Sequence, residues 1–579
     1  MQKFISTLIR LFPVLILSSC LLLPHPATQG KPLARITVDA GNYARLDTPV
    51  SLDLSGVSFG FPNEKSSLVE IKGNQRVPVP AQLEPGSPPR LWWILSGETP
   101  ADSKRIYELS LSSASVSPEP GVQVTKNDSV LVFKKGKRKI LQYNHAIVPA
   151  PEGQSKLYDR GGFIHPLWSP SGSILTEIHP KDHYHHLGIW MPWTKTKFEG
   201  KAVDFWNLKS GQGTVRFNRF LSTTSGPVYG GFKAEQDHVA LQTSSGEKTV
   251  LKEIWDVRVY NAGGPEKGYW IWDFVSSQRC VADSPLLLEE YRYGGFGFRA
   301  TGDWKGETAA YLTSEGKTRK DGHATRARWC DTAGVSDGKW KGVTFFSSPK
   351  NFRHPEAMRI WPGFDQEVFF NWAPVQTGDF EMKPGQDHKF RYRMFVHEGK
   401  VNVERTEQLW NDYAHPPKIT LDATPPKNAV VLFDGRYNDK EKDFSHWTAD
   451  GGKKVGWDSD DGVMKIVPKS GSIITKMDVT DFKMHIEFKT PQLPADVTGQ
   501  GRGNSGIYIQ RRYELQILDS FGLVPKKNDC GSLYKFKAPD TNACDMPGRW
   551  QSYVIILHAA MFNGSKKVKN ARITVWHNG

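Results

Sequence analysis

Cysteine is scarce in this sequence, with five residues among 579. Four of them, Cys280, Cys330, Cys530 and Cys544, follow Cys20 at intervals unlike those of a zinc site. Cys530 and Cys544 fall in one predicted domain and could form a disulfide, and the alternative is two separate buried thiols. The cysteines therefore do not indicate a zinc domain, and they do not point to a function.

The sequence also lacks a concentrated stripe of positive charge. Its formal net charge is +14, yet lysine and arginine are interleaved with acidic residues. The densest basic segments, 134–139 and 566–569, stand beside glycine or asparagine in predicted hairpin turns, where solvated loop tips are expected. We therefore expect no nucleic acid among the partners.

Long helical periodicities are few, and no internal repeat is evident. Short runs in which apolar and polar residues alternate are frequent, and the chain holds 53 glycines and 38 prolines. These features predict a mostly β, multidomain protein. Most of the 19 tryptophans are expected in β cores, although aromatic rings also stack on sugars.

The N-terminal segment is predicted to be a targeting signal. Basic residues precede an apolar stretch at 11–17, and residues 17–20 resemble a bacterial lipobox in which Cys20 is lipidated. Residues 1–20 are thus expected to be a lipoprotein signal peptide, and ordinary cleavage near Gly30 is the alternative. Because the stretch is short and interrupted by proline, we expect an exported protein of the cell envelope or periplasm, attached to the membrane only by a lipid anchor.

Changes in composition divide the remaining chain into three predicted domains. A small β module is expected at 31–118 and a larger, histidine-rich β domain at 121–413, followed by a β-sandwich at 428–579. A helix is predicted at 403–413, and the four prolines that follow it mark the clearest domain boundary.

Histidine is concentrated in the middle domain, where five of the 17 histidines lie between His165 and His186. Imidazole can ligate metal ions, donate to sugar hydroxyls or transfer protons near neutral pH. No glutamate or cysteine stands at a familiar zinc interval, and a loop held by imidazole hydrogen bonds is the structural alternative. The candidates for a secondary site are His183, His185, His186 and Arg299.

Four motifs of this domain resemble the bacterial methane-oxygenase-like PmoA family. They are Asp182–Gly188, Asp204–Trp206, Gly294–Arg299 and Val396–Gly399. An exported β domain lacks the membrane helices of such an oxygenase subunit, so the family label is not taken as its activity. The domains that accompany such a family imply an association with carbohydrate breakdown.

The segment 503–519 reads as two short strands joined by a basic turn, each with one apolar face. The polar side carries carboxylate, amide and phenol groups, a composition that suits sugars. A further strand at 482–489 alternates in the same way and places His485 and Glu487 on its polar side. If this strand lies beside the other two, these side chains converge with Glu514 and Gln516 in one cleft.

The C-terminal domain resembles the 3-keto-disaccharide hydrolase domain family. The resemblance rests on Leu432–Gly435, Asp481–Phe488, Asn504–Tyr508, Tyr513–Asp519, Gly531–Tyr534 and Gly548–Trp550. It implies a concanavalin-like β-sandwich after the larger β region, and cleavage of glycosides whose C3 carries a ketone. Such a ketone acidifies the C2 proton, so a base can start an elimination that water addition completes.

Roles for individual residues follow as expectations from this resemblance. His485 or Glu514 is the expected base, and Glu487 is expected to be the acid or a carboxylate that orients the ligand. The expected sugar-binding residues are Asn504, Tyr508, Gln510 and Gln516. The substrate is then an oxidised glycoside or oligosaccharide, and a divalent metal cofactor is left open.

Two other interpretations remain at this point. The chain could be a non-catalytic, carbohydrate-binding surface lipoprotein, or the histidine-rich domain could hold the catalytic site while the C-terminal domain binds sugar. The sequence ends at Asn578-Gly579, where a hairpin turn would lead into a further strand, so we expect that either the sequence is a fragment or the C-terminal domain is incomplete.

Overall fold

The computed structural model describes residues 33–54, 65–85, 89–112, 121–423, 429–435, 439–460, 462–494 and 496–578. The expected signal peptide at 1–20 and its Cys20 lie outside these residues. The predicted mostly β, multidomain architecture is confirmed, with strands in many sheets and few helices. In the described part of the chain, no helix has the length and apolarity needed to cross a membrane.

The N-terminal module consists of a five-stranded and a three-stranded antiparallel sheet around one core. The larger sheet contains, in order, β28 (Lys418–Ala423), β1 (Ala34–Asp39), β7 (Lys104–Ser112), β3 (Lys65–Lys72) and β4 (Gln75–Val79). The smaller sheet contains β2 (Arg45–Asp53), β6 (Arg90–Thr99) and β5 (Ala81–Glu84). Ala34, Ile36 and Val38 of β1 are fully buried in the core, as the alternation in this strand requires.

One strand of the module comes from beyond the middle domain. The predicted helix is found as α1 (Val403–Ala414), and the chain then returns as β28, which pairs antiparallel with β1. Buried Arg45 donates to Asp412 of this helix at 3.2 Å, so the helix is attached to the module as well. The segment after the helix therefore ties the module to the middle domain.

The middle domain is built on two eight-stranded sheets and a four-stranded sheet. The first sheet contains β24 (Met358–Ile360), β25 (Phe369–Trp372), β20 (Gly297–Arg299), β12 (Ile189–Trp190), β11 (Phe163–Leu167), β10 (Arg138–Asn144), β9 (Val130–Lys135) and β8 (Gln123–Lys126). The second contains β15 (Gly213–Thr224), β16 (Tyr229–Thr243), β17 (Gly246–Gly264), β18 (Tyr269–Cys280), β27 (Asp387–Glu398), β23 (Lys339–Ser347), β22 (Trp329–Ser336) and β21 (Ala309–Thr313). The small sheet contains β14 (Lys201–Val203), β13 (Thr196–Phe198), β19 (Leu286–Leu288) and β26 (Phe380–Met382).

The strands of this domain enclose a large aromatic core. Its fully buried tryptophans include Trp193, Trp255, Trp270, Trp272, Trp304 and Trp372. For these residues the expectation of a core position is confirmed, and none of them is available to stack on a sugar at the surface.

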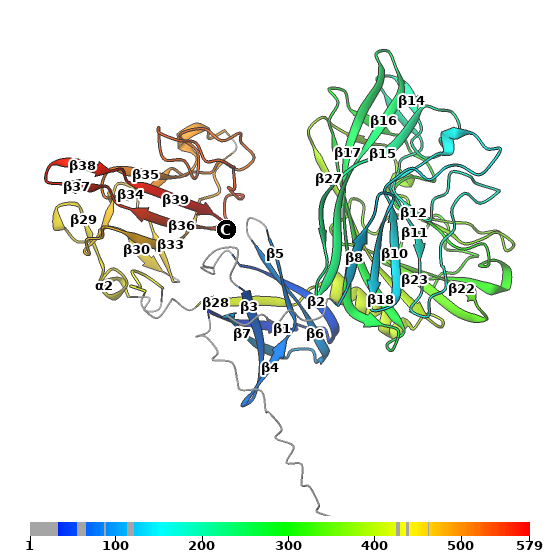
Figure 1. Cartoon of the computed structure of the whole chain (residues 1–579), viewed down its shortest axis with the longest axis horizontal. Helices are drawn as coiled ribbons and strands as arrows, with labels where there is room; N and C mark the ends of the chain where they lie inside the picture. Colours follow the sequence, from blue (N-terminus) through cyan, green and yellow to red (C-terminus); the bar gives the residue numbers. More distant parts are fainter. Residues whose placement is uncertain are drawn as a thin grey trace, which may run out of the picture.

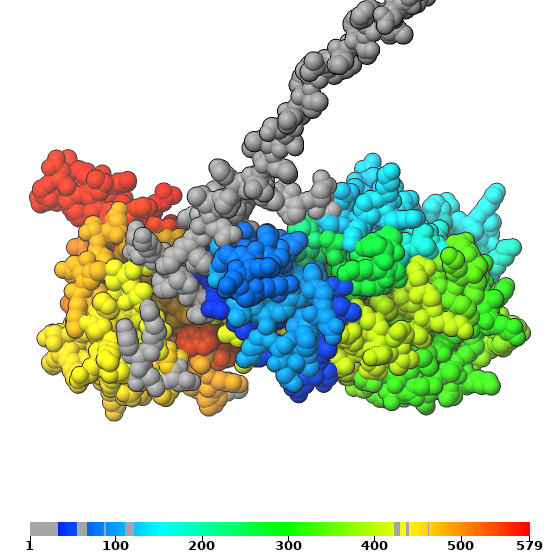
Figure 2. Space-filling model, turned by 90° about the horizontal axis from the view of Figure 1, so that it is seen from below, coloured from blue at the N-terminus to red at the C-terminus, as the bar shows by residue number. Residues whose placement is uncertain are grey.

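The N-terminal module packs directly against the middle domain. Trp92 of β6 and Tyr229 of β16 share a hydrophobic cluster, and Gln82 accepts a hydrogen bond from the Tyr229 amide. Arg258 donates to Glu84 of the module at 2.8 Å and lies over the Trp92 ring. Figures 1 and 2 show the module between the middle domain on one side and the C-terminal domain on the other.

The C-terminal domain contains a three-stranded sheet and several two-stranded ribbons. The sheet is formed by β33 (Phe482–Lys489), β36 (Trp550–His558) and β39 (Arg572–His577). The ribbons pair β34 (Ser505–Ile509) with β35 (Tyr513–Ile517), β29 (Trp447–Ala449) with β32 (Ile473–Thr475), β30 (Asp458–Asp460) with β31 (Val463–Lys465), and β37 (Met561–Asn563) with β38 (Lys566–Lys569). A short helix, α2 (Lys440–Asp443), precedes them.

One core joins the three-stranded sheet to the β34–β35 ribbon. Phe488 and Tyr553 enter it from the sheet, while Ile509 and Leu515 enter it from the ribbon. The Tyr553 hydroxyl crosses the core and donates to the Gln516 carbonyl oxygen at 2.7 Å. Sheet and ribbon thus face each other as the two layers of a sandwich.

Cys530 and Cys544 are free and buried in this domain. The Cys530 sulfur lies 3.1 Å from the Tyr553 hydroxyl, and the Cys544 sulfur accepts from the Ser520 amide at 3.4 Å. Of the two expected alternatives, the structure shows buried thiols.

Glu356 is the most perturbed carboxyl group of the middle domain core. It is fully buried and bonded only to neutral groups, namely the Ser347 hydroxyl, the Asn351 amide at 2.9 Å and the Tyr392 hydroxyl at 3.2 Å. Burial raises the pKa of Glu356 from 4.5 to about 7, and the hydrogen bonds only partly offset this effect.

The shift predicts a pH dependence of stability. Because the folded pKa lies above the unfolded one, the contribution of Glu356 is fully present below pH 4.5 and is lost as the pH rises through about 7. The loss amounts to on the order of 3 kcal/mol. Glu356→Gln should flatten the decline in unfolding free energy between about pH 4.5 and 7. Denaturant titrations that give parallel curves for both proteins would contradict this prediction.

Candidate functional site

The predicted sugar-binding face lies on the outer side of the β34–β35 ribbon. In the antiparallel register Gly506 is opposite Gln516 and Tyr508 is opposite Glu514, so these four residues share one face. The alternate residues of the ribbon enter the core. The alternation expected from the sequence is therefore present here.

Hydrogen bonds organise this face into two adjoining groups. The Tyr508 hydroxyl donates to Glu514 Oε2 at 2.9 Å, and this hydrogen bond is the main cause of the raised pKa of Tyr508. The buried Gln516 amide donates to Asn504 Oδ1 at 3.0 Å and to Gln500 Oε1 at 3.2 Å. The structure thus joins Tyr508 to Glu514, and Asn504 to Gln516.

Gln510 does not belong to either group. It lies in the turn between the two strands with φ +50° and donates to the carbonyl oxygens of Val479 and Thr480 at 3.4 and 3.2 Å. Its amide fixes the turn against the segment that precedes β33, so its expected role in sugar binding is not supported by its position.

The expected convergence of His485 and Glu487 with Glu514 is wrong. His485 Nε2 lies 3.4 Å from Glu487 Oε1, and both side chains project from the partly exposed side of β33. The alternate residues of this strand enter the same core that the ribbon fills from the opposite layer. Because each layer presents its polar side outwards, the His485–Glu487 pair and Glu514 lie on opposite faces of the sandwich.

A second cluster of functional groups lies in the middle domain, at one end of four neighbouring strands. The strand order β24-β25-β20-β12 and its antiparallel registers bring together the end of β24, the start of β25, the end of β20 and the start of β12. Trp361, Glu367, Arg299 and the 177–188 loop stand at these strand ends. The sheet order thus assembles residues that are far apart in the sequence.

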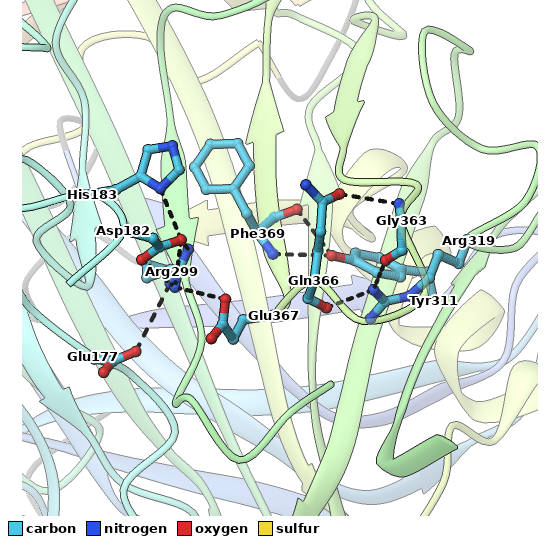
Figure 3. Close-up of polar contacts among 10 residues, drawn as sticks. All are labelled: Glu177, Asp182, His183, Arg299, Tyr311, Arg319, Gly363, Gln366, Glu367 and Phe369. Atoms are coloured by element: carbon cyan, nitrogen blue, oxygen red, sulfur yellow. Dashed lines mark hydrogen bonds and ion pairs between the residues drawn. The ribbon is translucent and has the colours of Figure 1, made fainter. Parts of the chain in front are cut away.

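Arg299 is the centre of this cluster. Its side chain is fully buried, and its NH2 group donates to Asp182 Oδ1 and to Glu367 Oε2, both at 3.1 Å. Its Nε atom lies 3.9 Å from Glu177 Oε2, and its guanidinium stands 5.0 Å from the Trp361 ring centroid. Figure 3 shows the three carboxylates around this guanidinium.

The loops that carry the carboxylates are themselves fixed. Arg299 pairs through its backbone with the 177–188 loop, donating to the Gly188 carbonyl at 2.8 Å and accepting from the Glu177 amide at 3.2 Å. Arg319 holds the turn before Glu367 by donating to the carbonyl oxygens of Gly363 and Gln366, each at 2.8 Å (Figure 3). The carboxylates are therefore held in place before any ligand arrives.

The predicted histidines gather beside Arg299. The His183 ring stacks on the His186 ring at 4.7 Å and lies 5.4 Å from the His185 ring, while His183 Nδ1 lies 2.8 Å from Asp182 Oδ2. Burial lowers the pKa of His185 to about 3 and holds that of His186 well below its usual value. Both rings are therefore neutral at pH 7.

The carboxyl groups around Arg299 shift in opposite directions. Burial raises the pKa of Glu177, and the neighbouring Glu367 and Asp182 carboxylates add to the effect. For Asp182, Arg299 and the hydrogen bond from His183 outweigh burial, so the pKa falls. Neighbouring carboxyls with opposite shifts are a feature of acid–base sites.

Sequence reasoning identified the histidines and Arg299 but missed Glu177, Glu367 and Trp361. Asp182 was part of a motif without being assigned a role. No local pattern connects these residues, because they meet only through the strand order of the sheet. Among the described residues, no group of three or more His, Cys, Asp or Glu side chains is placed to hold a metal ion.

A surface depression of about 660 Å³ lies elsewhere on the middle domain. It is lined by Arg138, Pro170, Ser171, Pro265, Lys339, Trp340, Glu398, Gly399 and Lys400. No residue of the two sites described above lines it, so the depression belongs to neither site.

Two family models match the chain. Residues 428–579 match the 3-keto-alpha-glucoside-1,2-lyase-like domain, which confirms the expected resemblance of the C-terminal domain and its concanavalin-like fold class. Residues 131–411 match DUF6807, a family of unknown function, so the expected resemblance to the PmoA-like family is not supported. The C-terminal match indicates a carbohydrate-active protein.

Several solved structures resemble parts of the chain. A proposed glycosyl hydrolase from Parabacteroides distasonis is 39% identical over 27% of this chain and 65% of its own, with a TM-score of 0.24. The GH36 alpha-galactosidase AgaB from Geobacillus stearothermophilus is 8% identical over 48% of this chain and 42% of its own, with a TM-score of 0.24. A proposed aldose 1-epimerase from Klebsiella pneumoniae is 10% identical over 66% of this chain and 97% of its own, also with a TM-score of 0.24.

The chain therefore spans less than two thirds of the length of the first two structures. No curated protein matches it.

The contacts of Arg299 predict a large effect of its removal. Arg299→Met leaves Asp182 and Glu367 without their buried counter-charge and should lower the unfolding free energy by on the order of 3 kcal/mol. Arg292→Met is the matched control, because Arg292 is exposed and lies over the rings of Tyr291 and Tyr293. Equal melting temperatures of the two variants, measured by calorimetry, would contradict the central role of Arg299.

Proposed function

We propose that the protein is an exported carbohydrate-active enzyme whose C-terminal domain cleaves 3-keto-glycosides by elimination. The observation that carries the proposal is the family match of residues 428–579, together with a paired carboxylate and phenol on the outer face of its β34–β35 ribbon. Glu514 is the proposed base. The His485–Glu487 pair is not part of this centre because it lies on the other face.

The proposed elimination transfers the C2 proton to the protein, breaks the C1–O bond and protonates the departing aglycone. Glu514 takes the C2 proton, which the neighbouring C3 ketone makes acidic. The electron pair forms the C1–C2 double bond, and the C1–O electrons leave with the aglycone, which takes up a proton from solvent. Water then adds to the unsaturated ketosugar and restores a saturated ring.

Neighbouring side chains support this assignment. The hydrogen bond from Tyr508 fixes one oxygen of Glu514 and leaves the other for the substrate. Asn504 is exposed and is oriented by Gln516 and Gln500, so its amide is the proposed partner for sugar hydroxyls. Because these planar side chains are already held in place, they do not have to be ordered when a sugar binds.

Export and membrane attachment belong to the same proposal. The lipobox-like sequence that ends at Cys20 supports secretion and a lipid anchor. In this proposal the enzyme acts outside the cytoplasm, and its substrate there is an oxidised glycoside or oligosaccharide.

The assignment of the base predicts a sharp contrast between the two faces. Glu514→Gln should lower kcat for aglycone release from a chromogenic 3-keto-α-glucoside by about 10²- to 10⁴-fold, as expected for loss of a general base. His485→Ala and Glu487→Gln are matched controls on the opposite face and should retain wild-type turnover. Loss of activity in the controls but not in Glu514→Gln would refute the assignment, and a wild-type protein that binds the glucoside without turnover would leave only a binding function.

Gly506 offers a second test that leaves the chemistry of Glu514 intact. A Cβ atom at this position would lie 2.4 Å from Glu514 Oε1, so Gly506→Ala should push the carboxylate aside. A displacement of about 1 Å can cost roughly 10²-fold in rate. We expect reduced kcat with little change in melting temperature, and almost no further loss when Gly506→Ala is added to Glu514→Gln. Fully additive losses in the double variant would show that Gly506 acts by another route.

A further inference from the structure

The side chains around Arg299 form a partly exposed rim that the proposed function does not use. We call Glu177, Asp182, His183 and Glu367 the acidic rim. Their side chains are 35%, 41%, 35% and 29% exposed, whereas the Arg299 side chain beneath them is fully buried. The rim is therefore open to a ligand, while the charge that organises it is not.

Three members of the rim, Glu177, Glu367 and His183, each keep one atom without a hydrogen-bond partner in the described part of the chain, whereas both oxygens of Asp182 are bonded. Glu367 contacts Arg299 through Oε2 and Glu177 approaches it through Oε2, which leaves Oε1 of both residues unbound. His183 uses Nδ1 toward Asp182, so Nε2 has no partner among the described residues. In the neutral tautomer whose Nδ1 donates to the carboxylate, Nε2 is an acceptor.

A purely structural role of Arg299, in which it only holds the neighbouring loops in place, does not account for these free acceptors. If Arg299 only held the loops together, we would expect its carboxylate partners to direct both oxygens towards the guanidinium. In addition, two fully buried nitrogen atoms at the base of the rim, Arg299 Nε and His186 Nδ1, lack a hydrogen-bond partner in the described part of the chain. A ligand or an ordered water molecule can supply the partners that such buried polar atoms need.

The charge of the rim restricts its ligand. Three carboxylates surround one guanidinium, and His185 and His186 beside them are neutral because burial lowers their pKa values. Anionic ligands are therefore repelled. A ligand that matches the rim carries several hydrogen-bond donors and no negative charge.

We propose that the acidic rim is a second sugar site, which binds a neutral sugar through hydroxyl groups that donate to Glu177, Glu367 and His183. Arg299 and Asp182 are its positioning residues. The choice of a sugar among hydroxyl-rich ligands rests on the proposed function of the C-terminal domain. The site itself belongs to the middle domain, for which the matching family model gives no function.

The test uses the full chain and calorimetric titration with methyl α-glucoside, with glucuronate as an anion of similar size. The wild-type protein should bind the neutral glucoside, whereas glucuronate should bind at least about tenfold more weakly. His183→Ala and Glu367→Gln should each weaken glucoside binding by roughly tenfold or more, because each removes one acceptor. Maltotriose, titrated in parallel, distinguishes a site for free sugars from one for chain ends.

Glu514→Gln separates this proposal from the proposed function. Binding that survives Glu514→Gln but is lost in His183→Ala supports the acidic rim, whether or not the C-terminal domain turns over its substrate. Binding that is lost only in Glu514→Gln, or that is equal for glucoside and glucuronate, or that is absent from the wild type, overturns it.

Folding of the variants is monitored by melting temperature, and His183→Gln replaces His183→Ala if the latter is unfolded. Wild-type affinity in folded His183→Gln and Glu367→Gln would also overturn the proposal.

Discussion

A strand in a two-layer sandwich has one face in the core, and this constraint decides which side chains of the C-terminal domain can cooperate. β33 and the β34–β35 ribbon fill the same core from opposite layers, so their polar sides point away from each other. Glu514 consequently has Tyr508 as its partner, and His485 has Glu487. Any chemistry at Glu514 depends on groups carried by its own layer.

A different constraint shapes the middle domain, where a buried guanidinium requires compensation. Arg299 obtains it from Asp182 and Glu367, with Glu177 nearby, and these residues lie on loops that follow or precede different strands. Burying an arginine costs free energy unless its N–H groups are paired with acceptors. The loops that carry these carboxylates therefore meet at Arg299. The same contacts leave carboxylate oxygens and an imidazole nitrogen at the surface, which is the basis for a site in this domain.

The fold class and several local features could be predicted from the sequence. Alternating residues identified the strand at 482–489 and the two strands within 503–519, and they indicated which side chains share a face. The helix at 403–414 was found almost at its predicted bounds. Alternation does not tell which layer a strand joins, and this is why the convergence of His485 with Glu514 was wrong. Pairing of β28 with β1 joins segments that are nearly 400 residues apart, and no local sequence pattern predicts it.

The middle domain shows the same limit of prediction from sequence, here for residues that were missed. Histidine density and Arg299 pointed to the correct region, but Glu177 and Glu367 enter it only because β12, β20 and β25 are neighbours in the sheet. Both residues matter because they lie beside the buried charge of Arg299, which is 122 residues from Glu177 and 68 residues from Glu367 in the sequence. Composition and spacing do not reveal such a contact.

The most direct measurement is a crystal structure of the full chain carrying Glu514→Gln, soaked with a 3-keto-glucoside. The account predicts that the ketosugar ring lies over the β34–β35 ribbon, with C2 facing residue 514 and a hydroxyl in contact with Asn504. A ring bound instead over His485 and Glu487, on the outer side of β33, would contradict it.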